Sequence, residues 1–407
     1  MNWKIIVLAV FILKVIYELL LDIVRYRSAG NPTPENVADV FDAETYQQWK
    51  KYMGEKSRLQ ISGTIVSALT TLVLLLCNVH AAVAAWFGAG AFWQVVAVLL
   101  LESVVDLLTG VVFSYIDTMI IEEKYGFNRS TIKTFVIDQI RGFLLGLLLN
   151  AAITFTLLGL HQWLGDWVVL LFTAALFGFT LLISFLYPIF SRLGNKFVPL
   201  EDGELKDRLM GLLQKHGYQV KAIEVMDASR RTTKLNAYFT GFGKMKTIVL
   251  YDNLINAMST DEICAVFAHE LGHGLHKDVL KQQIMNLGNL LILAIIAWLV
   301  VREPILHTAF GFEGVNYGFA YLLLSIFLGL VQPLTGMLTS AYSRHAEYRA
   351  DRQAVQEGYG EALITGLKKL AKENFAHLAP AKLLVVLEYS HPPLSQRIAA
   401  IEKELHK

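Results

Sequence analysis

Two histidines and a glutamate near the middle of the chain have the types and spacing of a zinc peptidase site. His269, Glu270 and His273 form the pattern H-E-x-x-H. On a helix, positions i and i+4 share a face, so both imidazoles can bind one Zn²⁺ while Glu270 reaches a water beside the metal. The flanking residues are mostly apolar, and buried histidines need partners. The pattern therefore predicts one catalytic Zn²⁺ per chain rather than an exposed helix with two solvated histidines.

A third zinc ligand is needed, because a catalytic zinc usually has three protein ligands and an open fourth position. Residues 343–351 read as a second helix, with Glu347 and Asp351 four positions apart on one face. We expect Glu347 to be the third ligand and Asp351 to accept a hydrogen bond from the far nitrogen of a ligating histidine. A solvated charged helix is the commoner fate of such a run, so this prediction depends on the first motif.

The segment before the H-E-x-x-H helix predicts a small sheet on which a peptide substrate can lie. A free sheet edge binds an extended peptide through backbone hydrogen bonds. Within it, Asn236, Ala237 and Tyr238 are candidate substrate-binding residues, and the Asn236 amide can hold a substrate carbonyl; a turn-favouring Asn entering a strand is the alternative. The pattern predicts a helix over 203–217 and strands over 219–225, 236–241 and 246–251.

Near the carboxyl terminus, His391 and Arg397 flank a rigid double proline. An imidazole and a guanidinium together can stabilise a tetrahedral oxyanion or bind a carboxylate. A helix that begins at Pro-Pro with ordinary surface charge is the other interpretation. We carry both residues forward as catalytic candidates.

The composition is that of a membrane protein. Hydrophobic residues make up 54% of the 407 residues and charged residues only 17%. Seven apolar runs approach or exceed the roughly 20 residues needed to cross a bilayer. The predicted fold class is therefore mainly α, a polytopic membrane protein with about seven transmembrane helices plus a small α/β zinc-peptidase domain. The runs cover about 4–22, 60–87, 93–120, 136–160, 166–190, 284–301 and 317–340.

Charged residues inside these runs indicate a polar interior. Glu102 and Asp106 lie four apart in the third run, and Asp138 and Arg141 three apart in the fourth. Such groups are costly in hydrocarbon unless they face protein or water. They predict either a hydrated cavity or interhelical ion pairs, and the sequence does not separate the two.

Basic residues between the runs predict the orientation, because cytoplasmic loops collect Lys and Arg. The first and third loops are rich in them and the second and fourth carry none, which places residues 191–283 and 341–407 in the cytoplasm. The apolar runs on either side of residues 191–283 form the membrane segments 1–190 and 284–340. The last two runs cross the membrane and return, so Glu347 is on the same side as the two histidines and can meet them. The net charge of +1 gives no nucleic-acid footprint.

Taken together, the motifs resemble the type I CAAX prenyl endopeptidases, a family of integral-membrane gluzincins. The resemblance implies seven spans enclosing a water-filled chamber, zinc held by His269, His273 and Glu347, and Glu270 as general base. It also implies that Asn236, His391 and Arg397 surround the substrate, with Asp351 and Arg344 supporting the ligands. The matching motifs are H-E-L-G-H at 269–273, S-R-x-x-E-x-x-A-D at 343–351, N-A-Y at 236–238, H-P-P with Arg at 391–397, and E-x-x-Y-G-F-N at 122–128.

The predicted function is a membrane zinc metalloendopeptidase, with CAAX processing of prenylated proteins as the family activity. The short connection from Arg302 to Tyr317 favours a bacterial inner membrane over the endoplasmic reticulum. Quality control of unprenylated membrane proteins is then an alternative. A transporter or channel with structural zinc is a third, motivated by the carboxylates inside the apolar runs. A structural zinc needs four protein ligands, and His276, three positions after His273, is the residue that could supply the fourth. Expected partners are peptide or protein substrates and membrane lipid.

Overall fold

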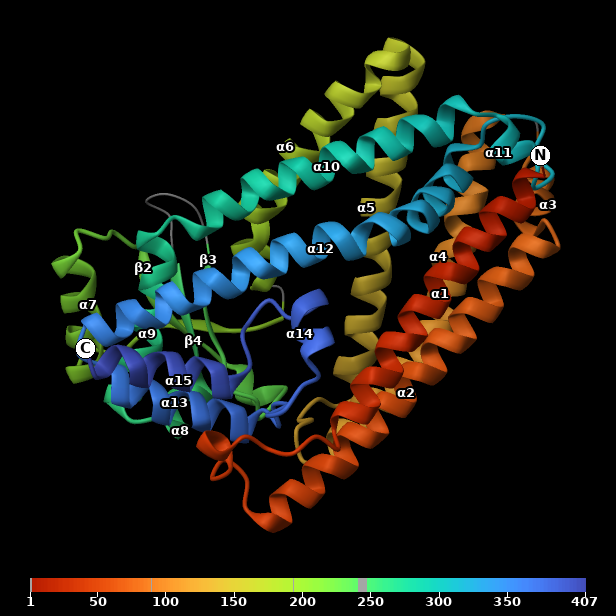
Figure 1. The fold of residues 1–407 in the computed structure, drawn as a ribbon. Helices are drawn as coiled ribbons and strands as arrows, with labels where there is room; N and C mark the ends of the chain where they lie inside the picture. Colours follow the sequence, from red (N-terminus) through yellow and green to blue (C-terminus); the bar gives the residue numbers. More distant parts are fainter. Residues whose placement is uncertain (1, 89, 193, 241–246) are drawn as a thin grey trace.

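Long helices form most of the molecule, and a small sheet with shorter helices lies at one end (Figure 1). The computed structural model describes residues 2–88, 90–192, 194–240 and 247–407. The amino terminus lies at the far end of the long helices from the sheet, while the carboxyl terminus lies beside it. The structure is mainly α with one mixed sheet, as the sequence predicts.

Each of the seven apolar runs lies mostly in a long helix. Their apolar side chains pack against one another in a core that includes Phe172, Phe319 and Leu323, each fully buried. The second run also covers the short α3 (Val79–Trp86), and α4 continues as a π-helix, Ile116–Glu122. The long helices are α1 (Trp3–Ser28), α2 (Ala43–Leu76), α4 (Ala91–Tyr115), α5 (Ile132–Leu164), α6 (Val168–Ser191), α10 (Asp278–Arg302) and α12 (Tyr317–Gln356).

Five stretches in the described residues are long and apolar enough to cross a membrane. One of them, Ile132–Leu186, contains both α5 and most of α6. The helix α1 is not among the five, and it carries Lys14, Glu18 and Asp22 within its apolar sequence. The chain is therefore a multi-pass membrane protein.

The helix α12 differs from the prediction in one respect that matters for the site. A span over 317–340 and a separate helix over 343–351 were expected, but the structure has a single helix of 40 residues. Nothing between Ser340 and Ser343 interrupts a helix, and Pro333 lies inside it. The third candidate ligand is therefore rigidly continuous with a membrane helix.

The sheet has four strands in the order β1-β2-β4-β3. Strands β2 and β4 are parallel, and β3 pairs antiparallel with β4, which leaves the other side of β3 as a sheet edge. The buried β4 residues Ile248 and Leu250 pack with Phe267 and Leu271 of α9 (Thr260–Leu275). The strands are β1 (Phe197–Pro199), β2 (Ala222–Met226), β3 (Ala237–Thr240) and β4 (Thr247–Tyr251).

The three predicted strands correspond to β2, β3 and β4, whereas β1 has only three residues and was not predicted. Residues 241 and 246, at the ends of two predicted strands, lie outside the described residues. The predicted helix over 203–217 is α7 (Glu204–Lys215). The remaining helices are α8 (Asp252–Ala257), α11 (Ile305–Thr308), α13 (Gly360–Glu373), α14 (Lys382–Leu387) and α15 (Leu394–Leu405).

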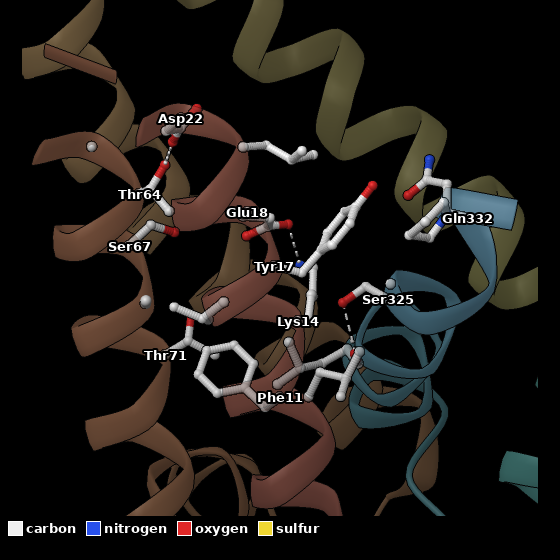
Figure 2. A pocket seen from close by; sticks show the side chains of 18 of the residues that line it. Phe11, Lys14, Tyr17, Glu18, Asp22, Thr64, Ser67, Thr71, Ser325 and Gln332 are labelled. Atoms are coloured by element: carbon white, nitrogen blue, oxygen red, sulfur yellow. Dashed lines mark hydrogen bonds and ion pairs between the residues drawn. The ribbon is translucent and has the colours of Figure 1, made fainter. Parts of the chain in front are cut away.

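A cavity of about 930 Å³ lies among the long helices, lined by residues of α1, α2, α4 and α12. Figure 2 shows polar side chains around it, with Tyr17 and Glu18 from α1 on one side and Ser325 and Gln332 from α12 on the other. Both Glu102 and Asp106 line this cavity, which favours the cavity interpretation for this pair. The Glu102 carboxylate also contacts buried His80.

The second charged pair fits neither interpretation, because its partners are not on two different membrane helices. The guanidinium of Arg141 lies 3.8 Å from the Asp138 carboxylate, and Arg231 from the segment before β3 also bonds Asp138. An ion pair that joins a membrane helix to the sheet segment therefore accounts for Asp138.

Candidate metal centre and active site

The three predicted ligands meet between α9 and α12. His269 Nε2 lies 3.5 Å from one Glu347 carboxylate oxygen, and His273 Nε2 lies 3.2 Å from the other. One ligand atom from each residue falls within 4.8 Å of the others, a spacing that suits one metal ion. Across the described part of the chain, this is the one such group of His, Cys, Asp and Glu. His276 caps the end of α9 and is not in it.

The other nitrogen of each imidazole is bound to an acid. His269 Nδ1 lies 2.9 Å from Asp351 Oδ1, and His273 Nδ1 lies 3.0 Å from Asp278 Oδ2. With Nδ1–H donating to a carboxylate, Nε2 is left with its lone pair, which is the form that binds a metal. Both acids therefore fix the rings in the ligating tautomer.

Basic and hydroxyl groups hold these two acids in turn. Arg397 donates from Nε to Asp351 Oδ2 at 2.9 Å and from Nη2 to Oδ1 at 2.6 Å. On the other side, Tyr342 OH donates to Asp278 Oδ1 at 2.9 Å, and Arg349 bonds the same oxygen. Each histidine thus belongs to a chain of hydrogen bonds that ends in an arginine.

The residues fit a zinc ion. Glu347 is 4% exposed, and its Oε2 forms no hydrogen bond with any described residue. Burial alone would lower the pKa of His273, but the carboxylates of Glu347 and Asp278 raise it to about 9. The group therefore favours a cation at its centre, and two imidazoles with one carboxylate are a zinc donor set with a position left for water.

Glu270 has the freedom that a general base requires. It is partly exposed on α9, and its carboxylate has no hydrogen bond to any described residue. The acids that support the imidazoles, Asp351 and Asp278, are buried and hydrogen-bonded, whereas Glu270 is partly exposed and lacks such bonds. A carboxylate that is available to water beside a metal site is suited to accept a proton.

Glycine at position 272 brings the two ligand helices together. A Cβ on Gly272 would lie 3.0 Å from Ala350 Cα and 3.0 Å from Gln353 Cβ, closer than carbon atoms ordinarily pack. The residue lies between the two histidines on α9 and faces the α12 turn that follows Glu347. This close approach sets the distance between the histidines and the carboxylate.

The structure places His391 and Arg397 differently with respect to the ligands. His391 Nε2 lies 3.4 Å from Glu347 Oε1, and its side chain is 63% exposed. Arg397 is buried, and its Nη1 lies 3.3 Å from Glu347 Oε2 in addition to the bonds with Asp351. The accessible imidazole suits contact with a substrate, whereas the guanidinium is engaged in orienting the ligands.

Arg344 does not contact the metal ligands, which it was expected to support. Its Nη1 donates to the carbonyl oxygens of Val385 at 2.6 Å and Tyr389 at 2.8 Å, and it contacts none of the ligands. Val385 lies in the last turn of α14, and Tyr389 lies two residues before His391. Arg344 therefore supports the loop that carries His391.

The candidate substrate residues lie on the edge strand. Asn236 is exposed and directly precedes β3; its side-chain oxygen accepts the Ala237 N–H at 2.9 Å. Ala237 and Tyr238 pair with Leu250 and Val249 of β4. Since β3 contacts α9, the sheet edge and the metal group lie in one region of the fold.

Sequence reasoning missed Asp278 and its partners Tyr342 and Arg349. Asp278 begins α10 and falls within the predicted cytoplasmic segment 191–283, and its spacing of five residues after His273 did not single it out. Arg349 lies in the predicted second motif, but its partner was not known. Only the packing of α10 against α12 brings the three together.

Comparisons with known proteins agree with this geometry. A family model described as the CAAX prenyl protease N-terminal region with five membrane helices matches residues 22–192. A second, Peptidase family M48, matches residues 199–405. Together they cover almost the whole chain.

Individual relatives match over nearly their full length. The CAAX prenyl protease 1 homolog of Oryza sativa is 32% identical, with 97% of this chain and 96% of that protein covered. CAAX prenyl protease 1 of Saccharomyces cerevisiae is 28% identical over 98% of this chain and 95% of its own. The crystal structure of S. mikatae Ste24p superposes with a TM-score of 0.92 at 27% identity, covering 99% of both chains.

The ligand group has three residues, with Glu270 beside it, whereas a structural zinc is closed by four protein ligands. Together with the match to a peptidase family, this favours hydrolysis over a transporter with structural zinc. The chain belongs to the CAAX prenyl protease 1 family of membrane zinc metalloproteases, within peptidase family M48.

Proposed function

We propose that His269, His273 and Glu347 hold the catalytic Zn²⁺ and that Glu270 is the general base for peptide-bond hydrolysis. The observation that carries this proposal is the meeting of both Nε2 atoms at one buried carboxylate, with both Nδ1 atoms occupied by acids. When bound, the metal acts as a Lewis acid that lowers the pKa of water and polarises the scissile carbonyl.

The protein's own residues then divide the work. Glu270 accepts the proton of the attacking water and returns it to the leaving amine. Asp351 and Asp278 keep the ligating imidazoles in one tautomer and orientation. His391, which is accessible beside Glu347, donates a hydrogen bond to the oxyanion of the tetrahedral intermediate. Arg397 supports this arrangement by holding Asp351.

The substrate is proposed to lie in extended form along β3. The unpaired side of this strand offers backbone donors and acceptors to a peptide, and the strand contacts the helix that carries the metal ligands. The exposed amide of Asn236, at the start of β3, donates to a substrate carbonyl, and Ala237 and Tyr238 bind the peptide backbone. Substrate and metal are thereby brought together on one side of α9.

We propose CAAX-type processing of prenylated proteins as the activity, because the relatives named above are CAAX prenyl proteases. A polar cavity among the membrane helices also suits peptide segments without a lipid, so quality control of unprenylated membrane proteins is a second candidate.

Digestion of matched farnesylated and unmodified peptides by the purified protein separates these two activities. A chelator and Glu270→Ala serve as controls that must both abolish cleavage. A strict need for the lipid supports CAAX processing, and equal cleavage of both peptides supports quality control. Cleavage that survives in Glu270→Ala would contradict the proposed site.

We propose a cytoplasmic location for the sheet and the carboxyl-terminal helices, based on the Lys and Arg distribution between the apolar runs. The relatives named above are eukaryotic, so the bacterial inner membrane stays a prediction that depends on the short segment between α10 and α12.

A further inference from the structure

The loop between α4 and α5 contacts the segment that leads into β3. Residues Glu122–Asn128, which run from the end of the π-helix through the turn before α5 and are here called the loop, carry the motif E-x-x-Y-G-F-N, which has no part in the metal centre described above. The segment, residues 231–235, directly precedes Asn236 and is here called the leader segment. Because the leader segment sets where β3 begins, its contacts bear on where a substrate strand would lie.

Backbone pairing joins the two. Asn128 and Thr232 form an antiparallel bridge. Next to it, the Arg129 N–H donates to the Arg231 carbonyl at 3.0 Å, and the Thr233 N–H donates to the Phe127 carbonyl at 3.3 Å. The loop therefore acts as a short additional strand against the leader segment.

Backbone hydrogen bonds, one glycine and one buried asparagine fix the shape of the loop. The Glu122 carbonyl accepts the N–H groups of Phe127 at 2.8 Å and Asn128 at 3.1 Å. Gly126 has a φ of 77°, which favours glycine. The buried Asn128 side chain accepts the Ser130 N–H at 2.9 Å, so both ends of the turn are fixed.

An ion pair adds to the backbone contacts. Lys234 Nζ of the leader segment lies 3.1 Å from Glu122 Oε2. The same carboxylate accepts a hydrogen bond from Tyr52 OH at 2.7 Å and lies 3.1 Å from Lys56 Nζ, so α2 takes part. Glu122 is the last residue of the π-helix, an element often found at functional sites.

The leader segment is held from its other side as well. Asn374 accepts the Leu235 N–H at 2.9 Å and donates to the Leu235 carbonyl at 3.1 Å. Asn253 donates from Nδ2 to the Lys234 carbonyl at 2.8 Å. The backbone directly ahead of Asn236 is thus fixed by side chains on both flanks, none of which is a metal ligand.

We propose that Glu122 and Asn374 are positioning residues for the substrate: through the leader segment they fix β3 against the metal centre and so select which peptide bond is cleaved. The β3 strand has only four residues and pairs with β4 alone, so its placement depends on its leader. A shift of two residues in strand pairing moves a peptide by about 6.5 Å and presents a different bond. This inference rests on the proposed binding of substrate along β3.

The test measures kcat, KM and the cleavage position for Lys234→Met, Glu122→Gln and Asn374→Ala. A long peptide that pairs with all of β3 is compared with a short peptide that ends beside the scissile bond. For the long peptide we expect KM to rise about tenfold and secondary cleavage positions to appear by mass spectrometry. Hydrolysis of the short peptide and the zinc content stay at wild-type values, and Lys234→Arg restores the single cleavage position.

Lys215→Met is the matched control, because it breaks a 2.7 Å ion pair between the end of α7 and Glu357 at the end of α12, and neither residue contacts the leader segment. It is expected to leave the KM and the cleavage position unchanged. Variants that lower kcat equally for both peptides, or that keep one cleavage position with wild-type KM, would overturn the positioning role. If the wild-type protein itself binds no zinc or does not hydrolyse the short peptide, that result would instead count against the proposed metal site.

Discussion

Replacing Gly272 with alanine should loosen the metal centre without unfolding the protein. The new Cβ would lie 3.0 Å from Ala350 Cα, whereas carbon atoms pack best at about 3.5–4.0 Å, so α9 and α12 must separate by about 0.5–1 Å. Metal–ligand distances tolerate about 0.2 Å. Because Glu347 is one turn before Ala350, the separation moves the carboxylate away from both histidines.

The expected magnitudes can be worked from the same contact. Overpacking costs about 1–3 kcal/mol, while alanine gains about 1 kcal/mol over glycine in a helix interior. The net change in the free energy of unfolding is therefore about 0–2 kcal/mol, but zinc affinity should fall about 5- to 150-fold if the strain is concentrated in the bound state.

Zinc affinity by chelator competition, together with thermal unfolding in detergent, measures both effects. Gly211→Ala in α7 is the control, since a Cβ there meets nothing within 4 Å and should only stabilise the helix. Wild-type zinc affinity in Gly272→Ala would refute the argument that this glycine sets the distance between the ligand helices.

Two further predictions concern the acids that hold the ligating histidines, and a third concerns His377, which contacts Ser28 away from the metal centre. Asp351→Ala should weaken zinc affinity about 10- to 100-fold, and unaltered affinity in a chelator titration would remove Asp351 from the site. Asp278→Ala should weaken zinc affinity to a similar extent, because Asp278 holds His273. Equal zinc retention by Asp278→Ala and the wild-type protein would contradict this prediction. Burial lowers the pKa of His377 to about 4, so the folded state holds it neutral and stability is lost as pH falls from about 6.5 toward 4. The loss is up to about 3 kcal/mol, and His377→Gln should flatten this part of the pH profile of thermal unfolding; an unchanged profile would contradict it.

The sequence predicted those parts of the site that depend on local spacing. His269, Glu270 and His273 follow from helical periodicity, and the position of Glu347 follows from two spans that return the chain to one side of the membrane. The long helices and three of the four strands were also predicted, because each has a continuous apolar run or a β-rich pattern between turn residues.

What was not predicted depends on contacts between distant segments. Packing between helices brings together three pairs that the sequence did not predict. Asp278 bonds His273, Arg344 bonds the carbonyl of Tyr389 ahead of His391, and Arg397 bonds Asp351. The bridge between Asn128 and Thr232 likewise joins residues with no local signal of pairing. Residue type showed that these groups were polar, but not which partner each would find.

The most direct test of the central assignment compares zinc content and peptide cleavage in Glu270→Gln and Glu347→Gln. Both substitutions keep the shape of the side chain and remove its charge. The assignment predicts that Glu270→Gln binds one zinc per chain but does not cleave, whereas Glu347→Gln loses both zinc and cleavage. Cleavage at the wild-type rate by Glu270→Gln, or full zinc retention by Glu347→Gln, would contradict it.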